Sequence, residues 1–271
     1  MAKPDHTKPD VWTRAAPDYE DMFLPLSSQV AAAALRRIKL DPGDRFLDVA
    51  AGTGAVTLQA VEMGAEVTAI DYAEGMLGFL RDKLTESDID SVAVRVMDGQ
   101  ALDFDDDSFD AAGSNLGLVF FEDPLAGLRE LKRVVRPGGR VFITSLAQSP
   151  PSVFSVLIDQ AITKVTPNFH PQGPVARYSF AGPDQMVQGL RAGGFSQADA
   201  ELEEVEWRVG DYAEYWDRWV MGSPPSAAAM RQLEPDLVAK AKAEYIKLCQ
   251  QEGPKYPQGF PIPVVIGLGR V

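Results

Sequence analysis

The sequence predicts an α/β fold built on a mostly parallel sheet with helices on both faces. Apolar, strand-like segments alternate with segments of helical periodicity through the first half of the chain. A loop of small residues directly follows the first apolar segment, and an acidic residue follows the second. Because repeated strand–helix–strand units place consecutive strands parallel, these observations favour a sheet built from crossover units.

The elements are expected in a regular order along the chain. Strands are expected at residues 45–49, 66–70, 92–97, 109–115, 140–146, 200–209 and 260–270. Helices are expected at residues 27–38, 57–63, 75–84, 125–135, 153–165, 183–192, 211–221 and 226–251. Ser27 or Ser28 is expected to cap the first helix after a polar N-terminal tail, and Asp123 is expected to cap the helix that follows Pro124.

The whole chain, residues 1–271, is expected to form one domain. Residues 27–148 are the expected cofactor-binding core, and residues 183–271 supply the remaining sheet and helices. The intervening residues 149–182 combine a proline pair, an apolar helical stretch and a loop rich in proline and glycine. We interpret this segment as a small helical and loop cap inserted over the site.

Composition disfavours several classes of partner. The formal net charge of -13 would repel a phosphate backbone, so nucleic acid is not the expected substrate. No apolar run reaches the roughly 18 residues of a membrane span, and the start of the chain is unlike a signal peptide, so we expect a cytoplasmic protein without a membrane span. With Cys249 as its single cysteine, the chain has no basis for an intramolecular disulfide, and no Cys/His spacing indicates a metal site.

The loop after the first strand has the features of a nucleotide-like ligand site. Gly52 and Gly54 let the backbone approach a ligand closely, and the N–H groups at the following helix start favour an anion such as an amino-acid carboxylate. Asp48 would supply a negative charge for a nearby ammonium group. After the second strand, Asp71 stands where a carboxylate can accept both hydroxyls of a ribose.

These residues resemble motif I of the class I S-adenosylmethionine-dependent methyltransferases, Asp-x-Gly-x-Gly-x-Gly, with Ala50 in place of the first glycine. Later motifs match in order at Asp71, residues 98–100, residues 109–116 and residues 131–139. The chain is similar to the branch that holds ubiquinone and menaquinone biosynthetic enzymes and small-molecule tailoring enzymes. The resemblance implies a Rossmann-like fold with a mostly parallel seven-stranded sheet, and S-adenosyl-L-methionine as cofactor.

The resemblance also implies a set of cofactor-binding residues. Asp71 would bind the ribose, Asp98 would accept from the adenine amino group, and Tyr19 would close over the methionine end. The implied set is Tyr19, Asp48, Ala50, Gly52, Gly54, Asp71, Tyr72, Met76, Asp98, Gly99, Gln100, Asn115 and Leu116. Structural roles compete at three of them: Met76 as core, Asp98 as a turn cap and Tyr19 as an anchor of the N-terminal segment.

The expected substrate is a small molecule. Methyl transfer from a sulfonium needs no protein nucleophile, so no catalytic residue is assigned. The candidate substrate-pocket residues are His170 in the expected cap loop and Phe121 after the fourth strand. We expect His170 to line the pocket rather than to act as a general base. Residues 115–121 lack the Asn/Asp-Pro-Pro-Tyr motif of base methylation, and Phe120, Phe121, Phe154 and Phe169 favour a partly apolar or aromatic acceptor.

Three functions remain open at this point. The favoured one is transfer of a methyl group to an O, N or C atom of a small organic acceptor by in-line displacement. A second is a non-methylating role for a protein that binds the same cofactor. A third is an NAD(P)-dependent oxidoreductase, which is disfavoured by the branched Thr57 in the helix start and by the missing Tyr-x-x-x-Lys spacing of short-chain dehydrogenases.

Overall fold

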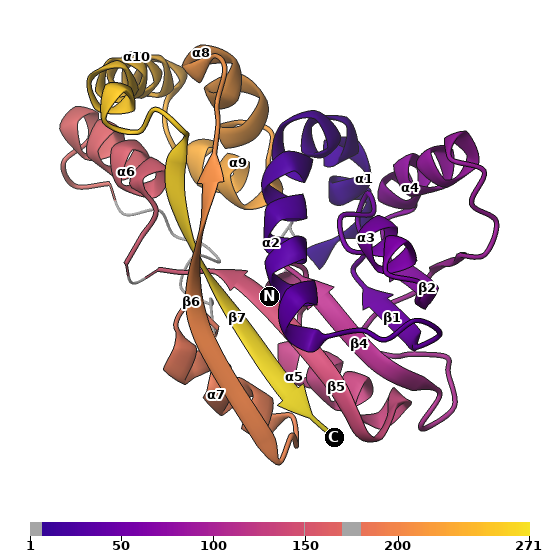
Figure 1. Ribbon diagram of the computed structural model, residues 1–271. Coiled ribbons are helices and arrows are strands. Elements are labelled where there is room, and N and C mark those ends of the chain that lie inside the picture. The colour runs from indigo at the N-terminus through magenta and orange to yellow at the C-terminus, as the bar shows by residue number, and fades with distance from the viewer. Residues whose placement is uncertain (1–6, 149, 170–179) are drawn as a thin grey trace.

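The computed structural model describes residues 7–148, 150–169 and 180–271, and its centre is a seven-stranded sheet (Figure 1). The strands are β1 (Arg45–Val49), β2 (Glu66–Asp71), β3 (Ala93–Val96), β4 (Phe109–Asn115), β5 (Val135–Leu146), β6 (Gln197–Trp207) and β7 (Phe260–Arg270). They lie in the order β3-β2-β1-β4-β5-β7-β6, and β7 alone runs in the direction opposite to the other strands. The predicted mostly parallel, seven-stranded sheet is confirmed.

Helices cover both faces of this sheet. One face carries α2 (Leu24–Ile38), α3 (Thr57–Glu62) and α4 (Glu74–Glu86), and the other carries α5 (Pro124–Val134) and α7 (Pro183–Ala192). Side chains along β1 alternate between the apolar layers on the two faces of the sheet. Phe46 packs on the side of α2, and Leu47 packs on the side of α5. This period of two explains why both faces of the strand are apolar.

The N-terminal segment differs from the prediction. A helix α1 (Pro9–Asp18) and a π-helical segment η2 (Tyr19–Phe23) run directly into α2, so the predicted polar tail and the predicted cap at Ser27 or Ser28 are wrong. Ser27 is 1% exposed and lies inside the helix, where its hydroxyl accepts a hydrogen bond from the Asn115 side chain. Helix α1 is held by Trp12 and Ala16, which pack on Ala73 and Met76.

Most other boundaries agree with the pattern to within a few residues. Asp123 caps α5 as predicted, because its carboxylate accepts from the backbone N–H groups of Leu125 (3.0 Å) and Ala126 (3.2 Å). The single helix expected over residues 226–251 is wrong. It is divided into α9 (Pro224–Met230) and α10 (Pro235–Glu252), since Pro235 cannot continue a helix and instead begins one.

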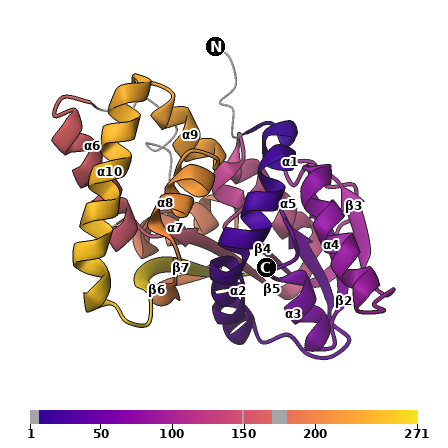
Figure 2. The ribbon, with the colours of Figure 1, turned by 90° about the horizontal axis from the view of Figure 1, so that it is seen from above.

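Beyond the carboxyl ends of the strands stands a group of cap helices (Figures 1 and 2). It contains α6 (Val153–Val165), α8 (Tyr212–Tyr215), the π-helical segment η5 (Trp216–Val220), α9 and α10. Helices α6 and α10 lie side by side. The group is therefore larger than residues 149–182, because α8 to α10 are inserted between β6 and β7.

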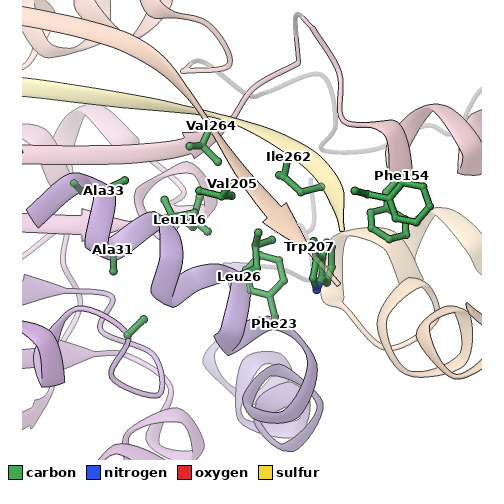
Figure 3. Close-up of a cluster of buried hydrophobic side chains, with 14 of the residues drawn as sticks. Phe23, Leu26, Ala31, Ala33, Leu116, Phe154, Val205, Trp207, Ile262 and Val264 are labelled. Carbon is green, nitrogen blue, oxygen red and sulfur yellow. The ribbon is translucent and has the colours of Figure 1, made fainter. Parts of the chain in front are cut away.

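An apolar cluster joins the sheet to this cap. Phe23 at the end of η2 and Leu26 at the start of α2 meet Trp207 of β6 and Ile262 of β7, and Phe154 of α6 lies beside Trp207 (Figure 3). The rings of Phe154 and Trp207 are 5.3 Å apart in an edge-to-face arrangement. The cap is thus anchored by buried aromatic side chains. In the part of the chain that the structure describes, no helix is long and apolar enough to cross a membrane.

The Asp123 cap can be tested by substitution. Asp123→Ala is expected to lower the free energy of unfolding by about 1 kcal/mol, because two N–H groups at the start of α5 lose their acceptor. Urea denaturation measures the change. The exposed Asp103→Ala is the control and should leave the midpoint unaltered, and a wild-type midpoint for Asp123→Ala would contradict the assignment.

Candidate functional site

The strand order reverses between β1 and β4, which is where open α/β sheets bind their ligands. A cavity of about 250 Å³ opens at the carboxyl ends of these two strands and continues under the cap. Its wall includes nine of the predicted residues, which are Tyr19, Ala50, Gly52, Asp71, Tyr72, Met76, Asn115, Leu116 and Phe121. The structure thus brings together residues that are widely separated in the sequence.

Left-handed backbone conformations shape the two loops at this edge. Ala50 and Gly52 after β1 have φ angles of 58° and 57°, and Leu116 after β4 has a φ of 59°. Such angles are uncommon for residues with a Cβ, and they concentrate at functional sites. A Cβ on Gly117 would lie 2.4 Å from the Cβ of Ala50, so glycine is required for the two loops to touch. Their backbones form a narrow cradle at the cavity wall.

Asp71 lies at the end of β2 and faces the glycine loop. Its carboxylate accepts from the backbone N–H groups of Gly52 and Ala73, both at 2.9 Å. Burial raises the pKa of this carboxyl to about 6, while the two N–H groups act against the shift. Each oxygen retains acceptor capacity, so Asp71 can also receive ribose hydroxyls from the cavity.

Asp48 lies behind the glycine loop and outside the cavity wall. It is completely buried, and its Oδ2 accepts from the Thr57 hydroxyl at 2.6 Å. Its Oδ1 has no hydrogen-bond partner within the described residues, and burial raises the pKa of the carboxyl to about 7. The side chain of Thr57 is therefore a partner of Asp48, which explains why a residue with a hydroxyl group stands at that position.

Gly54, like Asp48, lies outside the cavity wall and packs against α4. It has a φ of 100°, and a Cβ there would lie 2.6 Å from the Leu80 side chain of α4. The residue therefore allows the loop to pack tightly on α4. Its predicted cofactor role stays a prediction.

The loop after β3 is likewise set back from the cavity. The exposed Asp98 accepts from the backbone N–H of Gln100 at 2.9 Å, and Gln100 accepts from the N–H of Asp123 at 2.8 Å. Gly99 is buried, and a Cβ there would meet the Phe121 ring at 2.6 Å. These contacts fix the loop against the α5 cap and position Phe121. The predicted cofactor-binding role of Asp98, Gly99 and Gln100 stays a prediction.

A buried hydrogen-bond network connects Tyr19 with the ends of β4 and β5. The Tyr19 hydroxyl donates to Ser27 Oγ at 3.2 Å, and the Asn115 amide donates to the same oxygen at 3.0 Å. Asn115 in turn accepts from the Thr144 hydroxyl at 2.7 Å. Burial raises the pKa of Tyr19 to about 12. The phenol is therefore neutral at physiological pH and is a donor rather than a base.

Ion pairs hold the segment that carries Tyr19 from two sides. Glu20 pairs with Lys83 of α4 at 2.7 Å, and Lys83 also donates to the backbone oxygen of Thr53 at 2.9 Å. On the cap side, Arg218 of η5 pairs with Asp18 and Asp21 at 2.7 and 2.8 Å. The N-terminal segment is thereby fastened both to the glycine loop and to the cap.

The second half of the cavity is walled by aromatic rings, of which the sequence analysis named Phe154 but missed Phe23, Trp207, Tyr215 and Trp219. Phe23 stacks on Trp219 with centroids 4.5 Å apart, and Phe154 stacks on Tyr215 at 5.0 Å. Trp207 completes this half, and Trp12 adds to the other. The available signal was the density of Trp and Tyr between residues 207 and 219, where periodicity alone could not separate core from cavity.

The remaining predictions for the acceptor side have mixed outcomes. Phe120, Phe121 and Phe154 line the cavity, whereas Phe169 is outside its wall and packs against the core. His170 lies outside the described residues. Within residues 7–148, 150–169 and 180–271, no group of three or more His, Cys, Asp or Glu side chains could hold a metal ion.

Fold and cavity together define a class I methyltransferase architecture, and sequence comparisons agree. A family model described as a methyltransferase domain matches residues 47–143. A demethylmenaquinone methyltransferase of Corynebacterium kroppenstedtii is 32% identical over 185 residues, covering 65% of this chain and 75% of that protein. That of Clavibacter sepedonicus is 35% identical over 177 residues, covering 62% and 71%. The Corynebacterium efficiens enzyme is 34% identical, with 60% of its length covered.

Solved structures share the fold. The [4+2]-cyclase SpnF superposes with a TM-score of 0.56 at 22% identity, covering 90% of this chain and 81% of that one. A phosphoethanolamine N-methyltransferase 2 of Haemonchus contortus in complex with S-adenosyl-L-methionine gives 0.53 at 17% identity, covering 89% and 52%. The chain belongs to the class I S-adenosylmethionine-dependent methyltransferases, and S-adenosyl-L-methionine is its cofactor.

The residues at the cavity fit this cofactor. The cradle of Ala50 and Gly52 leaves room that a larger side chain would fill, and Asp71 provides a carboxylate at its edge. Tyr72 and Met76 offer an apolar wall for a planar base. When bound, the cofactor supplies a methyl group attached to a sulfonium. The neutral thioether that remains after transfer is a good leaving group. The protein's own contribution is then to hold an acceptor in line and to exclude water.

Asp71 generates a prediction about pH. Only its ionised form is a full acceptor, so the affinity for S-adenosylhomocysteine is expected to fall as the pH drops below about 6, by at most about tenfold per unit. Calorimetry between pH 5 and 8 measures this. Asp71→Asn should bind weakly and lose the step near pH 6. Equal wild-type affinity at pH 5 and 7.5 would exclude the role.

The Glu20–Lys83 pair generates a second prediction. Glu20→Gln is expected to weaken S-adenosylhomocysteine binding up to about fivefold, because the segment that carries Tyr19 loses its attachment to α4. Asp10→Asn, which breaks an exposed ion pair to Arg14 in the same segment, is the control. Titration of the three proteins tests the attachment, and equal affinities would show that Tyr19 is held without the ion pair.

Proposed function

We propose that this enzyme transfers the methyl group to an oxygen or carbon atom of a small aromatic acceptor of the phenol or hydroquinone type. The observation that carries the proposal is the single continuous cavity, which runs from the glycine loop at Gly52 to an aromatic half at Phe154 and Trp219. A planar acceptor can stack among these rings while its reactive atom points toward the donor.

The chemistry of the wall supports an acceptor that ionises readily by itself. Asp71 is the only carboxylate among the described residues of the wall, and it lies at the donor end. Tyr19 is a neutral phenol, so it cannot act as a base near neutral pH. A phenol or hydroquinone becomes a nucleophile by losing an acidic proton, and it depends less on a protein base than a protonated amine does.

The relatives point the same way. They are named as demethylmenaquinone methyltransferases, so their named substrate is a quinone-type aromatic compound. We assign the donor half of the cavity to Ala50, Gly52, Asp71, Tyr72 and Met76, with Tyr19, Asn115 and Leu116 at its junction with the acceptor half. Asp48, Gly54, Asp98, Gly99 and Gln100 hold the surrounding loops, and their predicted part in cofactor binding stays a prediction.

Product analysis tests the proposal. The enzyme is incubated with methyl-deuterated S-adenosylmethionine and with matched panels of naphthols, naphthohydroquinones and naphthylamines, and products are examined by mass spectrometry. Labelled methyl is expected on the naphthols or naphthohydroquinones, with a loss of at least about tenfold in Asp71→Ala. Asp103→Ala is the control. Methylation of the amines alone, or of no compound, would refute the acceptor class.

A further inference from the structure

Ser223 carries a hydroxyl group whose hydrogen-bonding capacity is unused. The residue is 2% exposed and forms part of the cavity wall. Its backbone is fully paired, because its N–H donates to the Trp219 oxygen at 2.8 Å and its carbonyl accepts from the Ala227 N–H at 2.9 Å. Its Oγ has no partner within the described residues. A buried polar group without a partner is unfavourable, so a ligand is the natural partner.

The local sequence removes one of the two usual partners of this hydroxyl. Ser223 stands at the N-cap of α9, where a serine side chain ordinarily accepts from the N–H of the second or third helical residue. The first two helical residues are Pro224 and Pro225, which carry no N–H, so the Ser226 N–H is the one usual capping donor left. The structure records no side-chain cap bond at this position.

A second serine in the same cavity provides the contrast. Ser152 is the N-cap of α6 and also lines the cavity. Its hydroxyl accepts from the Ser155 N–H at 3.2 Å and shares a hydrogen bond with the Ser155 hydroxyl at 2.8 Å. The hydroxyls of Ser152 and Ser155 are therefore engaged within the protein, whereas that of Ser223 is not.

We propose that Ser223 is a specificity-determining residue that hydrogen-bonds an oxygen atom of the acceptor, an inference that rests on the aromatic acceptor class proposed above. Ser223 belongs to the cap, whereas the donor cradle is built from the loops after β1 and β4. In a wall dominated by Tyr215, Trp219 and Val220, the unpaired Ser223 hydroxyl would distinguish an acceptor that bears an oxygen from one that bears a methyl group.

The test compares two probes of similar shape, 2-naphthol and 2-methylnaphthalene. Their dissociation constants are measured by equilibrium dialysis on the full chain saturated with S-adenosylhomocysteine. Ser223→Ala is expected to reduce the preference for 2-naphthol over 2-methylnaphthalene by about fivefold. Its affinity for S-adenosylhomocysteine is expected to equal that of the wild type. Ser155→Ala is the matched control, because its hydroxyl is already engaged with Ser152, and it should keep the wild-type preference.

The outcomes separate the two proposals. An unchanged preference in Ser223→Ala overturns the role of Ser223 and leaves the acceptor class standing. Weaker binding of S-adenosylhomocysteine in Ser223→Ala also overturns it, because the hydroxyl would then serve the donor. Failure of both probes to bind the wild type overturns the aromatic acceptor class, and the assignment of Ser223 with it.

Discussion

The site depends on the buried side chain of Asn115. Its amide donates to the backbone oxygen and the hydroxyl of Ser27 on α2, and its oxygen accepts from Thr144 on β5. Thr144 Oγ1 also accepts from the Leu116 N–H at 2.9 Å, which holds the left-handed turn after β4. Because a buried polar network is stable only when its members are paired, these three residues fix one another. This network therefore holds α2, the loop after β4 and the end of β5 together at the cavity wall.

The two π-helical segments pack against each other and both contribute to the cavity wall. Tyr19 and Phe23 belong to η2, and Trp219 and Val220 belong to η5. The rings of Phe23 and Trp219 stack, and Arg218 pairs with acidic residues on either side of Tyr19. π-Helical turns are often retained at functional sites because they reposition side chains relative to an α-helix. Here they turn aromatic groups from both segments toward one cavity.

Local sequence patterns predicted the sheet well, because the signals for each strand and turn lie within a few neighbouring residues. Each strand shows its own apolar run, and Asp123 followed by Pro124 identifies a cap without reference to distant residues. The glycine loop and Asp71 were found for the same reason. Ser27 was misplaced because its decisive partner, Asn115, lies 88 positions away. A serine before an alanine-rich helix is typical of a cap, and only the tertiary structure shows it buried.

The acceptor half was harder to predict, also for a physical reason. Trp207, Tyr215 and Trp219 come from three different elements, and their rings meet only when the cap packs on the sheet. A sequence cannot separate an aromatic residue that fills a core from one that lines a cavity, since both are buried. Here several residues do both, because Phe23, Phe154 and Trp207 belong to the core cluster and to the cavity wall (Figure 3).

The insertion of α8 to α10 has a consequence for how such enzymes diversify. Residues 208–259 leave the sheet after Trp207 and return at Phe260, and these two residues are direct partners in the pairing of β6 with β7. The ends of the segment are therefore about 5 Å apart, one strand spacing. A replacement segment must bridge that gap and pack on the N-terminal segment that Arg218 and Trp219 now contact, whereas strands β1 to β4 lie on the other side of β5. Exchange of this one excursion between paired strands would thus change the aromatic half of the cavity while the loops after β1 and β4 keep their place in the sheet.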